Sequence, residues 1–350
     1  MASVQCSPSI LYNQRHNTLF IKINRPESLN SFNMEMLNTM HYLVKKAKDE
    51  NLNLVISGKG RALSAGADIV TMAKGEINPE MAFESIYKLA YFASSLPTER
   101  VAFMNGITFG GGVGLSWSSS IRVSTPNTLW AMPEVTIGFV PDIGASYHLS
   151  RINPPELGLY LSLTGDRLNG VDCYLFGISE YFIEEDVDKV INEMYETGNL
   201  KPTLEKYHRE PNKNKSKIWP DLKDLIYCFN TYLGIEYIMY RLRELGTEWS
   251  LKTLERMKII CPLSLVIAQE SFRRGRHITY RESFIMEYNL ASQLIHHRAE
   301  NFRNAVKNKL IAKSKHGVGW VPDKITSIGD TTIRPYFLNK EGRKLELPRL

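Results

Sequence analysis

The sequence has few cysteines and no long hydrophobic run, and both absences narrow the class of protein. Its 350 residues include four cysteines, with no CxxC pair and no accompanying histidine cluster. This spacing argues against a disulfide framework and against a structural zinc site, so we expect free thiols. No apolar run reaches the roughly 18 residues of a membrane-spanning helix. The N-terminal residues show neither the apolar core of a signal peptide nor a clear transit segment.

The composition predicts a large folded protein that suits anionic ligands. Hydrophobic residues make up 43% of the chain, which is enough for a substantial core in one large domain or in one domain with an appendage. The net charge of +6 suits a phosphorylated ligand, and it equally suits nucleic acid or a ribonucleoprotein. The chain has neither a G-x-G-x-x-G motif that opens a βαβ unit nor a GK[ST] P-loop, which argues against nucleotide hydrolysis.

The order of periodic segments predicts an α/β fold. Strand patterns alternate with amphipathic helical patterns in the first half, and five helical patterns follow between residues 222 and 310, the last of them spanning 281–310. The tail after Trp320 is expected to be short strand or coil. We divide the chain into a core domain at 9–200, a polar linker or insertion at 201–220, a C-terminal helical region at 221–322 and a tail at 323–350.

Three stretches rich in small residues carry the features that point to catalysis. They are residues 62–68 (ALSAGAD), 105–114 (NGITFGGGVG) and 131–144 (AMPEVTIGFVPDIG). Small residues let the backbone approach a ligand, and two such loops that each open a helix can aim N–H groups at one point. Fixed donors of this kind form an oxyanion hole, which stabilises charge as it develops on a thioester oxygen. The alternative is that the glycines only permit tight packing of helices against strands.

Two acids in the third stretch, Glu134 and Asp142, are the candidate catalytic side chains. The prolines and glycines around them prevent a continuous helix, so the spacing alone leaves their separation open. If both face the oxyanion point, one carboxylate acts as base or nucleophile, while the other orients it or exchanges a proton with it. The alternative is a pair of solvated loop acids. The dispersed histidines and cysteines predict no metal site.

These stretches resemble the crotonase (enoyl-CoA hydratase/isomerase) superfamily, and the resemblance runs from about residue 9 to about residue 322. The matching motifs are NRPESLNSF at 24–32, ALSAGADI at 62–69, NGITFGGGVGLS at 105–116, AMPEVTIGFVPDIGASYHLSR at 131–151 and LTGDRLNG at 163–170. GGGVGLS followed by AMPE and PD-x-G resembles the 3-hydroxyisobutyryl-CoA hydrolase branch, as do CPLSL at 261–265 and Met286-Glu287-Tyr288. The resemblance implies a crotonase-like spiral of stacked strand–strand–helix turns with a C-terminal helical layer.

The resemblance also implies roles for individual residues. Ala67 and Gly111 would supply the two oxyanion-hole N–H groups, Glu134 the catalytic carboxylate and Asp142 the second acid. Gly114 stands where hydratases of the superfamily carry another catalytic glutamate, which argues against a hydratase. The residues expected at the substrate or CoA are Arg25, Ala65, Asp68, Ile69 and Gly110. The sequence departs from the hydrolase branch at Ser64 and Ala67, at Ile86, at 304–305 and at 312–314.

The function implied by the resemblance is hydrolysis of a small branched β-hydroxyacyl-CoA thioester, first of all 3-hydroxyisobutyryl-CoA in valine catabolism. CoA is then part of the substrate, and no separate cofactor is expected. The first alternative is a structural protein of the mitochondrial small ribosomal subunit, because relatives of the hydrolase branch serve there. Ribosomal RNA and proteins would then be the partners, and the lysines at 213–217 and 307–315 would contact RNA. An enoyl-CoA hydratase or isomerase is the third interpretation.

The expected location follows from the resemblance as well. The hydrolase branch implies the mitochondrion. The last three residues, Pro348-Arg349-Leu350, match a peroxisomal tripeptide at some positions only, which gives a second, weaker expectation. A homo-oligomer is compatible with the superfamily, and no membrane span is expected.

Overall fold

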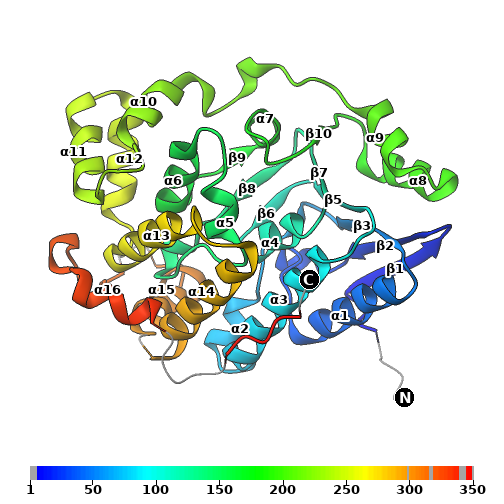
Figure 1. Ribbon diagram of the computed structural model, residues 1–350, viewed down its shortest axis with the longest axis horizontal. Coiled ribbons are helices and arrows are strands. Elements are labelled where there is room, and N and C mark those ends of the chain that lie inside the picture. The colour runs from blue at the N-terminus through cyan, green and yellow to red at the C-terminus, as the bar shows by residue number, and fades with distance from the viewer. Residues whose placement is uncertain (1–5, 298, 315–317, 339–343, 349–350) are drawn as a thin grey trace.

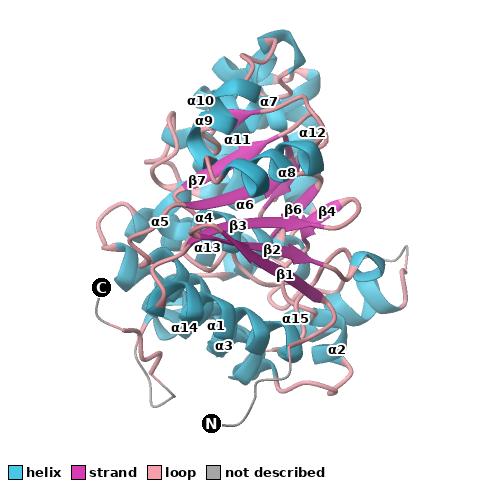
Figure 2. Ribbon diagram, turned by 90° about the vertical axis from the view of Figure 1, so that its right-hand side faces the viewer, coloured by secondary structure: helices cyan, strands magenta, loops and turns pink. Residues whose placement is uncertain are grey.

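Two β-sheets form the framework of the molecule (Figures 1 and 2). The structure is a computed structural model that describes residues 6–297, 299–314, 318–338 and 344–348. The strands are β1 (Ile10–Arg15), β2 (Thr18–Ile23), β3 (Asn53–Gly58), β4 (Ala62–Ser64), β5 (Arg100–Met104), β6 (Ile107–Phe109), β7 (Ile121–Ser124), β8 (Leu129–Ala131), β9 (Leu168–Asn169) and β10 (Tyr181–Phe182). The large sheet has the order β1-β2-β3-β5-β7-β10, and the small sheet has the order β4-β6-β8-β9.

Consecutive strands alternate between the two sheets. β3, β5 and β7 are parallel neighbours in the large sheet. The strand that follows each of them along the chain, β4, β6 or β8, takes the matching place in the small sheet, again in parallel. Each pair of strands therefore makes one turn of a spiral. This confirms the predicted α/β class with stacked strand–strand–helix turns.

Helices cover both faces of the large sheet, because its strands are apolar on both sides. Leu54 and Ile56 of β3 enter the main core, which also holds the apolar faces of α1 (Met34–Asp49) and α3 (Pro79–Ser94). Val55, between them, points the other way into a smaller core. The helices α8 (Val187–Thr197) and α9 (Leu200–Tyr207) close this smaller core.

The C-terminal part is a helical layer, as predicted. Its helices are α10 (Leu222–Cys228), α11 (Ile235–Leu245), α12 (Glu248–Lys258), α13 (Pro262–Gly275), α14 (Tyr280–Ser292), α15 (Glu300–Ala305) and α16 (Asp330–Phe337). The shorter helices before it are α2 (Ile69–Ala73), α4 (Gly111–Trp117), α5 (Ala145–Leu149), α6 (Pro155–Thr164) and α7 (Gly170–Leu175).

Two expectations about this layer were wrong. The pattern at 281–310 is not one α-helix. A π-helical turn at Gln293–His297 separates α14 from α15, and a second one at Val306–Ile311 follows α15. The tail is not strand or coil throughout, because it contains α16, which packs against α14 and buries Tyr336. Pro335 lies inside α16 and disguised its helical pattern in the sequence.

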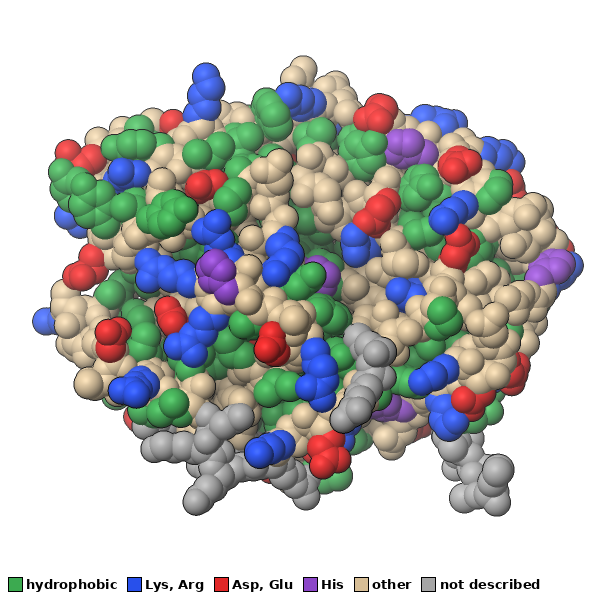
Figure 3. All heavy atoms as spheres, viewed as in Figure 1, with side chains coloured by type: hydrophobic (Ala, Val, Ile, Leu, Met, Phe, Trp, Pro, Cys, Tyr) green, Lys and Arg blue, Asp and Glu red, His purple; other side chains and the backbone are tan. Residues whose placement is uncertain are grey.

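The distribution of charge, the state of the cysteines and the expected lack of a membrane-spanning helix can be compared with the structure. Figure 3 shows lysine and arginine side chains interspersed with acidic and hydrophobic ones over the visible face. The four cysteines are free, as expected. Of the helices described, none has the length and apolarity to cross a membrane.

The segment expected to be a polar linker or insertion, 201–220, is held to the core domain. Most of α9 falls within it, and Asp172, at the third position of α7, anchors the rest. The Oδ1 atom of Asp172 accepts hydrogen bonds from Ser216 Oγ at 2.5 Å, Lys217 N at 3.0 Å and Ile218 N at 3.3 Å. Asp172 is fully buried, and its bonds to Ser216 and Ile218 are buried as well, so these two donors depend on it as their acceptor.

We expect Asp172→Ala to release this segment. The buried donors would lose their acceptor, which costs about 1–3 kcal/mol of unfolding free energy. Limited trypsin digestion should cut faster after Lys213, Lys215 and Lys217, and urea unfolding should show the lost stability. Glu205→Gln, in the same segment but on the exposed side of α9, is the control. Equal digestion rates for Asp172→Ala and the unsubstituted protein would contradict the anchor.

Candidate active site

The cavity that contains the predicted catalytic residues lies where three loops meet. These loops follow β4, β6 and β8, and parallel neighbours place their carboxyl ends at one edge of a sheet. The cavity has a volume of about 450 Å³. The predicted site residues that line it are Ala65, Ala67, Asp68, Ile69, Gly110, Gly111, Glu134 and Asp142. The fold thus brings together residues that are up to 77 positions apart in the sequence (142 minus 65).

The loops that carry Ala67 and Gly111 touch each other. A Cβ atom on Gly66 would lie 2.7 Å from Gly111 N, so only glycine permits this approach, and Gly66 also has a φ of +90°. A Cβ atom on Gly111 would lie 3.5 Å from Ala67 N, which puts the two predicted donors side by side. This close packing is the reason why the sequence needs small residues in both loops.

The backbone amides of Ala67 and Gly111 remain available. On one side, the amides of Ala65, Gly66 and Asp68 donate to Leu29 O, Ser64 Oγ and Phe32 O respectively. On the other side, the amide of Gly110 donates to Ala131 O. Within the described part of the chain, the amides of Ala67 and Gly111 have no such acceptor. Two neighbouring free N–H groups beside a cavity are suited to bind an oxygen that becomes negative.

Glu134 begins the 3-10 turn Glu134–Ile137, which follows β8 after Met132 and Pro133. Its side chain is buried, with 8% of the residue exposed, and Oε1 lies against the backbone of Gly110, where an added Cβ would be only 2.5 Å away. Oε2 has no hydrogen-bond partner among the described residues. A buried oxygen without a partner is costly, which is typical of a group kept for a ligand or a reaction.

Asp142 is the second buried acid of the cavity, with 3% exposed. Its Oδ2 accepts a hydrogen bond of 2.9 Å from the Tyr87 hydroxyl of α3. Burial and the negative charge of Glu287 raise the pKa of Asp142 well above its usual range, and the hydrogen bond from Tyr87 opposes this. Burial and the charge of Asp142 likewise raise the pKa of Glu134. The two acids therefore interact and do not behave as solvated loop acids.

Ile143 occupies the space beside Gly114. A Cβ atom on Gly114 would lie 2.5 Å from Ile143 Cγ2 and 2.8 Å from its Cβ, so no side chain fits at position 114. Ile143 has a φ of +56°, which is unfavourable for a β-branched residue by about 1–2 kcal/mol. A third acid cannot enter the cavity from position 114 unless Ile143 gives way.

The predicted ligand-binding residues divide into two groups. Ala65, Asp68, Ile69 and Gly110 line the cavity, whereas Arg25 is absent from its lining residues. Arg25 instead donates to Asp68 at 2.7 Å and to the backbone oxygen of Ser31 at 3.1 Å. The positive charge of Arg25 is therefore already compensated by Asp68, which belongs to the loop that Arg25 holds.

Sequence reasoning missed four residues of this neighbourhood: Tyr87, Ile143, Arg167 and Glu287. Tyr87 lies on the apolar face of α3, where its spacing is typical of a core residue. Glu287 was quoted only as part of a motif, although an acid on the buried face of α14 was a usable signal. Arg167 lines the cavity with its guanidinium 5.5 Å from the centre of the Phe109 ring, and no sequence pattern marked it.

A family model described as enoyl-CoA hydratase/isomerase matches residues 18–337. The chain belongs to this family. The 3-hydroxyisobutyryl-CoA hydrolase of Dictyostelium discoideum, named as mitochondrial, is 30% identical over 351 residues, which cover 94% of this chain and 91% of that protein. The human protein of the same name is 32% identical over 345 residues, which cover 94% of this chain and 88% of that protein. The crotonase resemblance is therefore confirmed.

Solved structures of family members share the fold of this chain. A carnitinyl-CoA dehydratase from Mycobacterium thermoresistibile has a TM-score of 0.88 and 24% identity, and the match covers 97% of this chain and 99% of that one. An enoyl-CoA hydratase from Rhodobacter sphaeroides has a TM-score of 0.83 and 22% identity, covering 94% and 97%. These likenesses establish the crotonase-like fold, and at such identities they carry no statement about the reaction.

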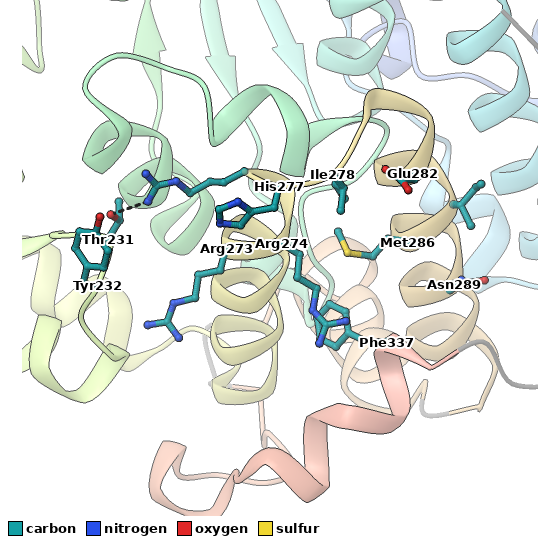
Figure 4. Close-up of a pocket in the computed structure, with 12 residues that line it drawn as sticks. Thr231, Tyr232, Arg273, Arg274, His277, Ile278, Glu282, Met286, Asn289 and Phe337 are labelled. Atoms are coloured by element: carbon teal, nitrogen blue, oxygen red, sulfur yellow. Dashed lines mark hydrogen bonds between the residues drawn. The ribbon is translucent and has the colours of Figure 1, made fainter.

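A larger and more open cleft, of about 850 Å³, lies away from the loops that follow β4, β6 and β8 (Figure 4). It is formed by α13, α14, α16 and the chain before α11, and its cationic side chains are Arg273, Arg274, Arg276 and His277. None of the predicted site residues lines it. Arg274 pairs with Glu270 at 2.8 Å, and Arg276 donates to Thr231 Oγ1. Among the described residues, no cluster of His, Cys, Asp or Glu could hold a metal ion.

The buried position of Glu134 predicts a pH-dependent effect on stability. Its pKa in the folded protein is raised above the ordinary value of 4.5, so the folded state binds this proton more tightly than the unfolded chain. The stability that Glu134 contributes is therefore greatest at low pH and falls as pH rises above about 4.5. We expect Glu134→Gln to raise Tm relative to the unsubstituted protein more at pH 8 than at pH 5.

Thermal unfolding at the two pH values checks this expectation. Glu236→Gln replaces an exposed glutamate of α11 and should leave Tm nearly unchanged at both. If the difference in Tm between Glu134→Gln and the unsubstituted protein is the same at pH 5 and pH 8, the charge of Glu134 does not destabilise the folded protein.

The contact between Gly114 and Ile143 predicts non-additive stability effects. Gly114→Ala should cost about 1–3 kcal/mol, because an added methyl overlaps Ile143. Ile143→Gly should also destabilise, since apolar burial is lost. The double variant should lose less than the sum of the two, because the overlap needs both side chains. Urea unfolding of all three measures this, with Gly319→Ala, which meets nothing within 4 Å, as control. Strict additivity would refute the steric conflict.

Proposed function

We propose that the protein hydrolyses a small branched β-hydroxyacyl-CoA thioester, and that 3-hydroxyisobutyryl-CoA is the substrate. The observation that carries this proposal is the meeting of two buried acids, Glu134 and Asp142, with the free amides of Ala67 and Gly111 in one cavity. The 3-hydroxyisobutyryl-CoA hydrolases among the relatives, at about 30% identity over most of the chain, support the choice of reaction.

The cavity walls suit a small branched acyl group. Phe83, Ile86 and Phe139 supply apolar surface, and burial of methyl groups against such surface favours binding. Glu134 and Asp142 provide polar partners for a β-hydroxyl and for the reacting carbonyl. We assign the CoA portion to the loop of Ala65, Asp68, Ile69 and Gly110, with Arg25 holding that loop through Asp68.

In the proposed reaction, the amides of Ala67 and Gly111 bind the thioester oxygen. Glu134 attacks the carbonyl carbon and the carbon–sulfur bond breaks, so that an anhydride and a thiolate form. Water then hydrolyses the anhydride, which releases the acid and regenerates Glu134. In the other form of the mechanism, Glu134 removes a proton from water, and the hydroxide attacks the carbonyl directly. In both forms one thioester and one water give one acid and one thiol.

Asp142 handles the proton in this scheme. Two acids that share a buried site repel each other, so one of them keeps its proton. Glu134 must be ionised to attack, which makes Asp142 the proton carrier that delivers a proton to the departing sulfur. The negative charge of Glu287 supports this assignment, because it favours the protonated form of Asp142. Only an ionised Asp142 raises the pKa of Glu134 by its charge, so a proton on Asp142 removes that repulsion and lets Glu134 ionise. No separate cofactor takes part, and CoA belongs to the substrate.

We place the protein in the mitochondrion, because its relatives from Dictyostelium discoideum and Homo sapiens are named as mitochondrial. The weaker, peroxisomal expectation depends on the last three residues, of which Arg349 and Leu350 lie outside the described residues. In valine catabolism, the product would be the free branched hydroxy acid.

The structural role in the ribosome would use the lysine stretches differently. Lys309 donates a 2.7 Å hydrogen bond to Thr136 O, next to Glu134, and Lys213 lies 3.1 Å from the centre of the Trp219 ring. Both therefore have contacts within the fold. Lys315 lies outside the described residues. These contacts are made within the fold, whereas the structural role predicts that the same lysine stretches contact RNA.

Release of free thiol from 3-hydroxyisobutyryl-CoA by the purified protein tests the proposed function. Glu134→Gln nearly preserves shape but removes the negative oxygen, so turnover should fall at least ~100-fold. Asp142→Asn should cost less if Asp142 only orients Glu134, and about as much if the pair works as a unit. Glu236→Gln should match the unsubstituted enzyme.

Two results would contradict the proposal. One is an active hydrolase whose turnover is unchanged in Glu134→Gln. The other is an unsubstituted protein that releases no thiol from 3-hydroxyisobutyryl-CoA. Co-sedimentation of such an inactive protein with small ribosomal subunits would then favour the structural role.

A further inference from the structure

Glu287 is a fully buried acid whose hydrogen-bond partners all lie at the start of α5. It lies on α14, and its exposed fraction is 0%. Oε2 accepts a hydrogen bond from Gly144 N at 2.5 Å, and Oε1 accepts from Ser146 N at 2.7 Å and from Ser146 Oγ at 2.5 Å. In the described part of the chain, no cation pairs with it. A buried carboxylate that is stabilised only by hydrogen-bond donors tolerates little displacement of those donors.

The loop that leads into α5 has a backbone that needs support. Ile143 and Gly144 are consecutive residues with φ values of +56° and +86°. Such a conformation persists only where surrounding contacts fix it. Asp142 immediately precedes this pair, so the direction of its side chain depends on the same backbone. Glu287 therefore holds the segment that aims Asp142 at the cavity.

The charge of Glu287 acts on the same group. The titratable side chains that feel it are Asp142 from the loop, Tyr87 from α3 and Tyr280 from α14 itself. Burial raises the pKa of Glu287 to about 7, so the carboxylate is charged above neutral pH. A neutral side chain of the same size would fill the space equally well. A carboxylate adds acceptors for three donors and a negative charge behind Asp142.

We propose that Glu287 is a positioning residue for thioester hydrolysis, which holds the loop of Asp142 in place and keeps the shared proton on Asp142 rather than on Glu134. This inference rests on the proposed function. Glu287 itself does not line the cavity, and its effect passes through Gly144 and Ser146.

Two substitutions separate the two effects. Glu287→Gln keeps the reach of the side chain but loses the charge and one acceptor. Glu287→Asp keeps the charge but is one methylene too short to reach both amides. Turnover should fall about 10- to 100-fold in either variant, the range for partners that orient a reacting group, with KM changed little. Glu282→Gln is the matched control, because glutamine also serves at this position of a capping box.

The pH profile distinguishes positioning from a merely structural role. The alkaline limb of turnover reports loss of the proton from Asp142. Removing the charge of Glu287 lowers the pKa of Asp142, so this limb should move to lower pH in Glu287→Gln. It should stay near its original position in Glu287→Asp. An effect on folding alone would lower turnover without moving the limb.

Hydrogen exchange gives a readout that needs no activity. The amides of Gly144 and Ser146 should exchange faster in Glu287→Gln, measured on a peptide that spans residues 138–149. Glu134→Gln should leave their exchange unchanged. If Glu287→Gln does not fold, Ser146→Ala removes the hydroxyl donor alone, and it should lower turnover in the same direction by less.

The outcomes separate this inference from the proposed function. Full turnover with an unmoved alkaline limb in Glu287→Gln overturns the positioning role while leaving the hydrolase intact. Unchanged exchange at Gly144 and Ser146 overturns it as well. An unsubstituted protein without thiol release overturns the proposed function, and with it the role of Glu287 in that reaction, whatever the exchange shows.

Discussion

The parallel pairing of β4, β6 and β8 is the constraint on which the site depends. Each of these strands has only three residues. Their pairing nevertheless places the loop after each strand at the same edge of the small sheet. The first two loops supply free amides and the third supplies the acids. A shift of register between the strands would separate these groups, so the short sheet needs the large sheet and its helices to fix it.

Much of the fold could be predicted from the sequence, because long periodic segments form the large sheet and its covering helices. The helical spacing of Met36, Met40 and Leu43, for example, corresponds to α1, which Asn33 caps by accepting from Met36 N at 2.9 Å. The strands β4 and β6 could not be predicted in this way. They lie in Gly- and Ala-rich stretches that are typical of loops, and three residues are too few to show alternation.

The candidate site was predictable only in part. The resemblance located Glu134, Asp142, Ala67 and Gly111, and the structure places all four at one cavity, although their roles remain predictions. Spacing could not reveal that Tyr87 and Glu287 contact the loop of Asp142, since they come from helices 55 and 145 residues away in the sequence (142 minus 87, and 287 minus 142). Arg25 was predicted at the substrate or CoA, whereas the structure pairs it with Asp68. The sequence motif alone gives no sign of this ion pair.

The overlap between position 114 and Ile143 has an evolutionary consequence. In this chain, a glutamate at 114 would need a smaller residue at 143, because the two side chains compete for one volume. A lineage that changed 114 first would pass through a clash, and one that changed 143 first would pass through a void beside Asp142. We expect either single change to cost stability in this chain, because one overpacks the site and the other leaves a cavity. Positions 114 and 143 are therefore expected to change together.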